Sequence, residues 1–336
     1  MRNEQVPDRN IAMELVRTTE AAALAAARWV GRGDKNSADG AAVAAMRLMM
    51  DTVDMDGLIV IGEGVKDEAP MLYNGENVGN GSGPQMDVAV DPLEGTRLTA
   101  EGRPGAVSVI AAAPRGTLFN PLDLFYMEKI AVGPEARGHI DLAAPIAWNI
   151  QQVARAKGIP KQEVTVIVLD RDRNTGVADE IRAAGARIRF ITDGDQPAAV
   201  SAALEGTGVD MLLGIGGSTE GVVSAVALKC MEGDFQGRLW ARDKEQIAYA
   251  AEHGLSLTDI LTIDDLVKSD DVFFAASGVT TGDLLKGVEY VAGGARSESL
   301  VMRSRSGTIR RITTEHHWRK LQELSGDRYV DLGAGR

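Results

Sequence analysis

In "EVTVIVLDRDRNTGVADEIRAAGARIRFI", residues 163–191, two short runs rich in β-branched residues flank a segment with the composition of a helix. The runs "EVTVIVLD" and "RIRFI" predict strands, and the segment between them predicts a helix near residues 174–185. A third strand is expected in "DMLLGIGG", after a predicted helix at 196–205 and before another at 219–232. Strands that alternate with helices favour an α/β fold in which at least part of the sheet is parallel.

The rest of the chain continues this alternation less regularly. A long alanine-rich helix is expected at residues 11–30, and Asp39 is a candidate cap of the next helix, "AAVAAMRLMMDTV". Further strands are expected in "DGLIVIGEG", "MDVAVD" and "AVSVIAAA", and near the C-terminus in "VFFAASGV", "GVEYVAGG", "SLVMRS" and "TIRRITT". We therefore predict mixed sheets. A boundary near "GIPKQ" divides the chain into domains at 1–160 and 161–315, and a tail follows at 316–336.

Composition and charge argue against several classes of protein. The chain has 336 residues, 44% of them hydrophobic, so it can bury a substantial core. A net charge of -12 argues against general binding to nucleic acids or anionic membranes, which are held by basic surfaces. The single cysteine, Cys230, allows no intrachain disulfide and no thiolate metal cluster, and we expect it in the core. No apolar run approaches the roughly 20 residues of a membrane helix, and "MRNEQVPDRN" is unlike a signal peptide, so we expect a cytoplasmic protein.

Five acidic residues lie where a predicted strand or loop ends, namely Asp39, Glu63, Asp91, Glu94 and Glu220. In open α/β folds ligands bind at such strand ends, so carboxylates far apart in the sequence can converge there. Carboxylate oxygens favour hard cations such as Mg²⁺ and Mn²⁺ over zinc. Alternatively, Asp39 and Glu220 are helix caps and Glu63 is a turn residue. Asp91 and Glu94 are then the strongest candidates for a cation site.

The segment "AVDPLEGTR", residues 89–97, gives this cation site its clearest signal. Two carboxylates this close repel each other in apolar surroundings unless a positive charge lies between them. Pro92 has a fixed φ angle and Gly95 permits a tight reversal, so the segment can direct both carboxylates and Thr96 into one small volume. Thr96 is then placed to position a water molecule. This arrangement favours metal-assisted hydrolysis of a phosphate ester.

The motif "DPLEGT" resembles the signature of the lithium-sensitive, metal-dependent phosphatases of sugars and inositols. Together with "GRGDKNSADGAAV", "VIGEG", "DEAPMLYNGE", "FYMEKIAVGP", "ITDGD", "GIGG", "EGVVSA" and "GVTTGDLLKGV", it makes residues 8–315 resemble the class II fructose-1,6-bisphosphatases. The resemblance implies a layered α-β-α-β-α sugar phosphatase fold, with an N-terminal metal-binding α+β domain and a C-terminal α/β domain for the substrate phosphate. It also implies hydrolysis of the 1-phosphate of fructose 1,6-bisphosphate in gluconeogenesis, two or three Mg²⁺ or Mn²⁺ ions, and a homodimer or homotetramer.

The resemblance assigns roles at the cation site. The implied metal ligands are Asp39, Glu63, Asp91, Glu94 and Glu220. Thr96 would position the attacking water with the help of a carboxylate, either Asp39 or Asp67. Lys35 would hold the phosphate that is cleaved. Without the resemblance, Asp67 and Lys35 are interpreted as solvated residues of polar loops.

A second set of residues is implied for the rest of the substrate. It comprises Tyr126, Arg171, Arg173, Asp193, Asp195 and Gly217. The arginines suit the distal phosphate because a guanidinium group donates two parallel hydrogen bonds to phosphate oxygens. The two aspartates can accept hydrogen bonds from sugar hydroxyls, and the helix after Gly217 offers free amides to an anion. Alternatively, Tyr126 is a core residue and "RDR" is a solvated surface loop.

Three positions depart from the pattern of the family. Val65 stands where glutamate is common, Asp172 lies between the two arginines, and Thr219 stands where proline is usual before the ligand glutamate. Every implied metal ligand is still in place, so the departures bear on the substrate more than on the reaction. The alternatives are a bifunctional fructose-1,6-/sedoheptulose-1,7-bisphosphatase, an inositol or sugar monophosphatase and, from another class, a non-catalytic sensor of sugar phosphates or metals.

Overall fold

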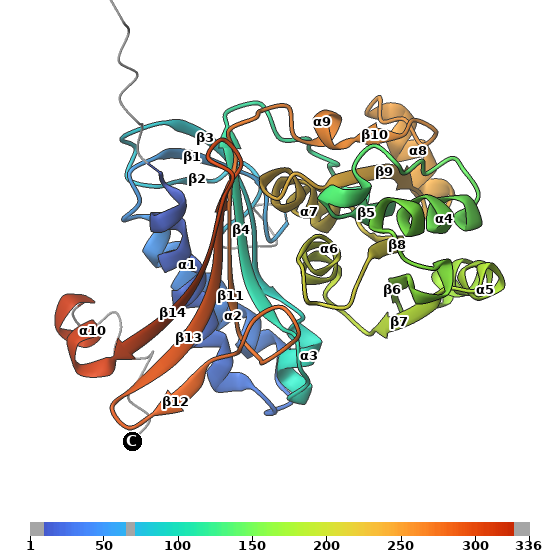
Figure 1. Cartoon of the computed structure of the whole chain (residues 1–336). Helices are drawn as coiled ribbons and strands as arrows, with labels where there is room; N and C mark the ends of the chain where they lie inside the picture. Colours follow the sequence, from blue (N-terminus) through green and yellow to red (C-terminus); the bar gives the residue numbers. More distant parts are fainter. Residues whose placement is uncertain (1–9, 65–70, 326–336) are drawn as a thin grey trace, which may run out of the picture.

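The computed structural model describes residues 10–64 and 71–325. Within these residues, helices alternate with two β-sheets in successive layers (Figure 1). Two long helices cover the outer face of the first sheet, a second pair lies between the sheets, and further helices cover the outer face of the second sheet. The predicted α/β fold with mixed sheets and α-β-α-β-α layers is confirmed.

The first sheet combines strands from both ends of the chain. Its described strands are β1 (Asp56–Ile61), β2 (Asn77–Val78), β3 (Gln85–Glu94), β4 (Val107–Pro114), β11 (Phe273–Gly278), β12 (Glu289–Val291), β13 (Gly294–Arg303) and β14 (Thr308–His317). Their order is β12-β13-β11-β4-β3-β1-β2, and β14 pairs with β13. β1 runs parallel to β3, whereas the other neighbours run antiparallel. The C-terminal strands therefore complete a sheet that begins near the N-terminus.

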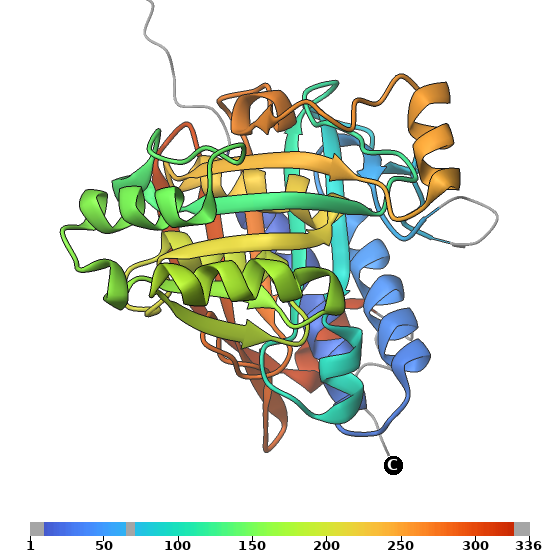
Figure 2. The same ribbon diagram turned by 90° about the vertical axis from the view of Figure 1, so that its right-hand side faces the viewer.

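The second sheet contains the three strands from which the fold class was predicted. Its described strands are β5 (Tyr126–Val132), β6 (Thr165–Leu169), β7 (Arg187–Ile191), β8 (Met211–Gly217), β9 (Asp234–Trp240) and β10 (Leu261–Thr262), in the order β10-β9-β5-β8-β6-β7. β6 runs parallel to β7 and β8, as predicted, through crossovers that contain α5 (Thr175–Ala184) and α6 (Asp195–Ala203). Figure 2 shows its strands crossing those of the first sheet at a steep angle.

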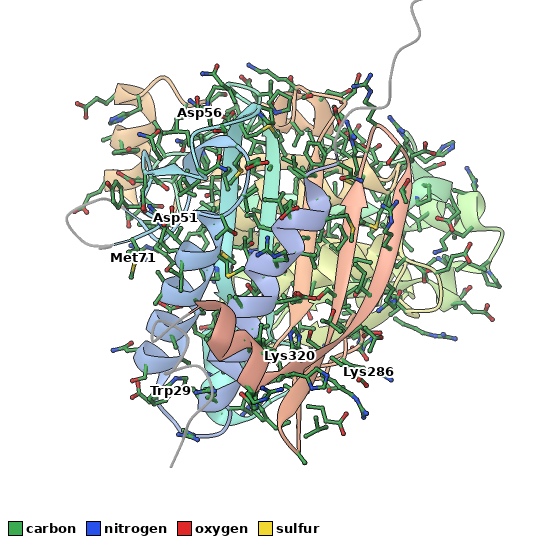
Figure 3. All side chains as sticks on the ribbon, turned by 90° about the vertical axis from the view of Figure 1, so that its left-hand side faces the viewer. Trp29, Asp51, Asp56, Met71, Lys286 and Lys320 are labelled. Atoms are coloured by element: carbon green, nitrogen blue, oxygen red, sulfur yellow. The ribbon has the colours of Figure 1, made fainter. Side chains whose placement is uncertain are left out.

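The helices occupy three layers. On the outer face of the first sheet, α1 (Ala12–Ala26) and α2 (Lys35–Met50) pack against each other (Figure 3). Between the sheets, α7 (Ser218–Cys230) contacts strands of both and is buried almost all round, which explains its lack of a polar face. Cys230 is buried there, as predicted. The other described α-helices are α3 (Thr96–Glu101), α4 (Ile146–Lys157), α8 (Lys244–Glu252), α9 (Ile263–Leu266) and α10 (Trp318–Ser325).

The start of α2 corrects one prediction. Asp39 was expected to cap this helix, but it lies inside it, and the cap is Asp34. The Asp34 carboxylate accepts hydrogen bonds from the Ser37 amide at 3.0 Å and the Ser37 hydroxyl at 2.6 Å, so the helix can begin four residues before Asp39. Asp39 is therefore free to serve another purpose.

Strand pairing does not follow the predicted boundary at residue 160. Strand β5 precedes the boundary but belongs to the second sheet, and β11 to β14 follow it but belong to the first. The division into domains stays a prediction. Within the described part of the chain, every helix is too short or too polar to cross a membrane.

Candidate active site

Four of the predicted acidic residues line a single cavity of about 300 Å³, which we call the acidic cavity. Its lining includes Asp39, Glu63, Asp91, Glu220 and Thr96. The first two come from α2 and the loop after β1, the next from β3, and Glu220 from the first turn of α7. The helix between the sheets thus brings its carboxylate to those of the first sheet, and the predicted strand-end cluster forms.

The local sequence explains how β3 presents two carboxylates. The pairing of β3 with β4 shifts register between Asp91 and Glu94, because three residue steps on β3 face only two on β4. Pro92 lies in this bulge, where its missing N–H costs no ladder hydrogen bond. Gly95 then takes a φ of 89° and caps α3, which begins at Thr96. The predicted reversal is confirmed.

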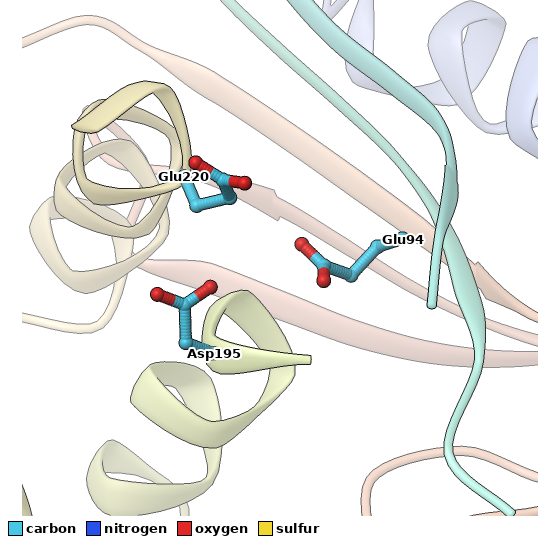
Figure 4. A group of neighbouring side chains, drawn as sticks. All are labelled: Glu94, Asp195 and Glu220. Atoms are coloured by element: carbon cyan, nitrogen blue, oxygen red, sulfur yellow. The ribbon is translucent and has the colours of Figure 1, made fainter. Parts of the chain in front are cut away.

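A second group of carboxylates lies beside the acidic cavity. One oxygen from each of Glu94, Asp195 and Glu220 lies within 4.8 Å of the others. Figure 4 shows the three side chains converging from β3, α6 and α7. Asp195 was predicted to accept hydrogen bonds from sugar hydroxyls; it lies beside two of the predicted metal ligands, and its role stays a prediction.

The carboxylates of this region repel each other. Burial, and then the charge of Asp39, raise the pKa of Glu63 to about 7. Burial and neighbouring carboxylates also raise the pKa values of Asp91 and Glu94 well above their ordinary range. The pKa of Glu220 is raised for the same reasons. Within the described residues, Asp39, Glu63, Asp91 and Glu94 form no ion pair. The ionised form of these carboxylates is favoured only when positive charge is added to the site.

The donor atoms fit a hard divalent cation. Carboxylate and hydroxyl oxygens dominate the polar lining of the acidic cavity, and Mg²⁺ and Mn²⁺ prefer oxygen ligands. Moreover, Glu94 Oε2 is buried and has no hydrogen-bond partner in the described protein. A buried carboxylate oxygen without a partner is costly unless a cation or water contacts it. The site therefore fits the predicted metal ions by its chemistry.

Two glycines of "GIGG" allow the carboxylates to approach. A Cβ atom on Gly217 would lie 1.7 Å from Glu220 Oε2, and one on Gly216 would lie 2.0 Å from Asp195 Oδ2. Neither position can carry a side chain without displacing an acidic group. The role predicted for Gly217, as part of a phosphate site at the start of α7, is not tested by this geometry.

Lys129 was missed by the sequence analysis. Its side chain is 2% exposed, forms an ion pair with Asp195, and donates a hydrogen bond to the Gly217 carbonyl at 2.7 Å. Its charge also lowers the pKa of Glu220, against the larger effect of burial. The signal was available in the sequence, because a lysine in the middle of the apolar strand "YMEKIAV" needs a buried partner.

A second cavity, of about 400 Å³, adjoins the first through Glu220, which lines both. We call it the substrate cavity, and its lining includes Tyr126, Arg171, Arg173, Asp193, Asp195 and Gly217, all predicted to bind substrate. The Arg173 guanidinium lies 4.6 Å from the Tyr126 ring centroid and donates to the Ile215 carbonyl at 3.0 Å. Burial raises the pKa of Asp193, and the charge of Arg171 opposes that rise. Tyr126 is thus half-buried at the cavity and is not a core residue.

Other predicted residues lie elsewhere. Lys35 is exposed at the start of α2 and lines neither cavity. Asp67 and Val65 lie outside the described residues. Asp172 is exposed and is not among the residues that line the substrate cavity, so the predicted negative charge between the arginines faces solvent. Thr219 donates a hydrogen bond from its hydroxyl to Glu220 Oε2 at 2.8 Å.

Two further residues were missed. Gln196, at the start of α6, donates a hydrogen bond from Nε2 to Asp91 Oδ2 at 2.9 Å and lines the acidic cavity. Arg242, just after β9, lines the substrate cavity. Sequence patterns do not mark either residue, because a single amide and a single exposed arginine are common in any loop or helix.

Partly buried carboxylates without counter-charges, joined to a cavity lined by arginines, fit the class of metal-dependent phosphatases that act on small phosphorylated molecules. Residues 9–316 match the model of the family described as bacterial fructose-1,6-bisphosphatase, glpX-encoded. The chain is 46% identical over 322 residues to fructose-1,6-bisphosphatase 1 class 2 of Escherichia coli (strain K12), and equally to the class 2 enzyme of Shigella flexneri. These alignments cover 92% of this chain and 96% of each relative. The chain belongs to this family and is a hydrolase, as predicted.

Proposed function

We propose that the protein hydrolyses the 1-phosphate of fructose 1,6-bisphosphate to fructose 6-phosphate and phosphate, as a step of gluconeogenesis. The observation that carries this proposal is the junction of the two cavities at Glu220. A bisphosphate can place one phosphate against the carboxylates and the other against Arg171 and Arg173. The similarity to class 2 fructose-1,6-bisphosphatases supports the same substrate.

The cations are proposed to be two or three Mg²⁺ or Mn²⁺ ions. The carboxylates of Asp39, Glu63, Asp91, Glu94 and Glu220 would hold them. When bound, they neutralise the charge of the phosphate and lower the pKa of the attacking water. Without cations, five anionic side chains would repel an anionic substrate. Binding of the phosphate therefore depends on the cations that these residues hold.

The protein side chains orient the reaction. Thr96 lines the acidic cavity at the start of α3, where its hydroxyl can hold the attacking water for an in-line displacement without a phosphoenzyme. Asp39 lines the same cavity and is the carboxylate assigned to accept the proton of that water. Asp67, the alternative, lies outside the described residues, and the role of Lys35 in holding the phosphate stays a prediction.

The remainder of the substrate is proposed to bind at the second sheet. Arg171 and Arg173 would donate hydrogen bonds to the distal phosphate, and Arg173 is already oriented by the Ile215 carbonyl and the Tyr126 ring. Asp193 would accept a hydrogen bond from a sugar hydroxyl. Asp195 would do so only with the oxygen that Lys129 leaves available. We also propose that the protein acts in the cytoplasm as a homodimer or homotetramer.

The test is phosphate release from fructose 1,6-bisphosphate by the purified protein with Mg²⁺, with Mn²⁺ or with EDTA. Sedoheptulose 1,7-bisphosphate and a panel of sugar and inositol monophosphates serve as comparison substrates. Release that requires a cation and prefers the fructose bisphosphate supports the proposal. Activity confined to monophosphates would remove the assigned role of the arginines, and no hydrolysis with any cation would favour a metal or sugar-phosphate sensor.

A further inference from the structure

Gln196 connects the two layers at the acidic cavity. It lies in the first turn of α6, between the sheets, and its side chain donates to Asp91, which belongs to the first sheet. Only 2% of the residue is exposed. The donor is therefore buried and Asp91 is partly exposed, and a hydrogen bond to a carboxylate is charge-assisted.

The orientation of the Gln196 amide follows from its partner. With a cation bound, Asp91 is ionised and can only accept hydrogen bonds, so the nitrogen of the amide faces Asp91 Oδ2. The amide oxygen then points away from that contact. This oxygen, Oε1, is buried and has no hydrogen-bond partner among the described residues.

An unpartnered amide oxygen in this position calls for an explanation. Leaving a buried acceptor unsatisfied destabilises the fold. A leucine or methionine would fill the same volume of α6 without that cost. The glutamine is therefore explained by what its nitrogen does, which is to hold Asp91, a residue that lines the acidic cavity.

Gln196 is a neutral hydrogen-bond donor, and its effect on a carboxylate differs from that of Lys129, which is a cationic donor. Lys129 pairs with Asp195 and balances its charge. Gln196 holds Asp91 through a hydrogen bond but leaves the full negative charge of the carboxylate in place. Asp91 is thereby fixed in orientation and still able to attract a cation.

We propose that Gln196 is a positioning residue for cation binding, an inference that rests on the proposed function. Its Nε2 atom fixes Asp91 Oδ2, so that Oδ1 is presented to the cation. Hydrogen bonds that orient ligating side chains in this way typically change metal affinity about 10- to 100-fold when removed.

The experiment is to titrate Mn²⁺ into the cation-free full-length protein by calorimetry, without substrate, for wild type and Gln196→Met. Methionine keeps the approximate length and volume of glutamine but neither donates nor accepts strongly. We expect the Kd for Mn²⁺ to rise about 10- to 100-fold. We expect little change in the thermal midpoint of the cation-free protein, because the unpartnered oxygen is removed together with the hydrogen bond.

Gln236→Met is the matched control. Gln236, on β9, uses both ends of its amide: Oε1 accepts from the Leu142 amide at 2.8 Å, and Nε2 donates to the Ile140 carbonyl at 3.0 Å. Its replacement should lower the thermal midpoint and leave the Kd for Mn²⁺ unchanged. A purely structural role for Gln196 would give the same result for Gln196→Met.

A second variant guards against a folding defect. Gln196→Asn keeps the amide but shortens the side chain by one methylene, so it should also weaken Mn²⁺ binding. Equal Mn²⁺ affinity in wild type and both Gln196 variants would overturn the inference while leaving the proposed function intact. Failure of the wild-type protein to bind Mn²⁺ or to release phosphate would overturn the proposed function, and the inference with it.

Discussion

The two sheets contribute carboxylates to the site in different electrostatic settings. Those from the first-sheet side, Asp39, Glu63, Asp91 and Glu94, form no ion pair in the described chain, and burial raises their pKa values. Asp195, beside the second sheet, pairs with the buried Lys129. One side of the site therefore requires added cations, and the other carries its positive charge within the fold.

The difference explains the division of labour in the proposed reaction. In that proposal, the carboxylates and Thr96 of the first-sheet side would act on the bond that breaks. On the second-sheet side, Arg171 and Arg173 would bind the distal phosphate, and Lys129 balances the charge of Asp195. Variants on the first side should mainly change kcat, and variants on the second side should mainly change stability or KM.

Removal of cations should have the largest effect. With EDTA in excess we expect phosphate release to stop and the thermal midpoint to fall, because the carboxylates of the first-sheet side then repel each other without compensation. Calorimetric scans and phosphate assays before and after chelation, followed by addition of Mg²⁺ or Mn²⁺, measure both effects. Glu20→Gln is a control outside the site: Glu20 is a partly buried acid that accepts a hydrogen bond from Thr314, and its neutralisation should leave the response to EDTA unchanged. A midpoint that does not respond to chelation would contradict the first half of the comparison.

Lys129→Met should have the next largest effect, and it acts on stability. Removing one partner of a buried ion pair leaves the other charge uncompensated, which costs roughly 3–5 kcal/mol. Urea denaturation of the cation-free protein should show this loss in the free energy of unfolding. The double variant Lys129→Met, Asp195→Asn should recover much of it, because no buried charge of the pair remains. If the single variant is as stable as wild type, then Lys129 does not balance Asp195 and the second half of the comparison fails.

Thr96→Ala should lower kcat about a hundredfold or more, by analogy with the loss of other preorganised contacts to a transition state. KM for the bisphosphate should change little, because the hydroxyl acts on the attacking water. Glu220→Gln should reduce kcat by a similar factor, since Glu220 lines both cavities. Thr99→Ala, one turn along α3, removes a hydroxyl that only donates to the Gly95 carbonyl, at 3.3 Å, and should keep kcat. Near-normal turnover by Thr96→Ala would show that the chemistry lies elsewhere.

The sequence predicts what depends on neighbouring residues. The alternation at 163–191 predicts the parallel strands of the second sheet, and "AVDPLEGTR" predicts the reversal at Gly95, although not the bulge at Pro92. In both cases the signal and the structure that it specifies lie within a few residues of each other. The same reasoning places the acidic residues at strand ends and so brings most of the candidate site together.

The sequence does not predict what depends on distant partners. Strands β11 to β14 belong to the first sheet, although the chain forms the second sheet between β4 and β11. No local sequence pattern specifies this return to the first sheet. Lys129 and Gln196 acquire their importance only from Asp195 and Asp91, which the fold brings to them. The cap of α2 was misassigned because two aspartates, Asp34 and Asp39, precede the run "AAVAAMRLMMDTV", and both are acceptable caps by residue type.

Arg173→Ala should have the smallest of these effects, and its effect should distinguish a bisphosphate from a monophosphate. A charge-assisted hydrogen bond is worth about 1.5–3 kcal/mol, so KM for fructose 1,6-bisphosphate should rise roughly 10- to 100-fold. KM for a sugar monophosphate should stay almost constant, since that substrate has no distal phosphate. Arg182→Ala, an exposed arginine on α5 paired with Asp179 at 3.2 Å, provides the control for a change in net charge. Equal rises in KM for both substrates would mean that Arg173 supports the shape of the cavity through Tyr126 and Ile215, and that the second-sheet side positions the sugar without distinguishing a bisphosphate from a monophosphate.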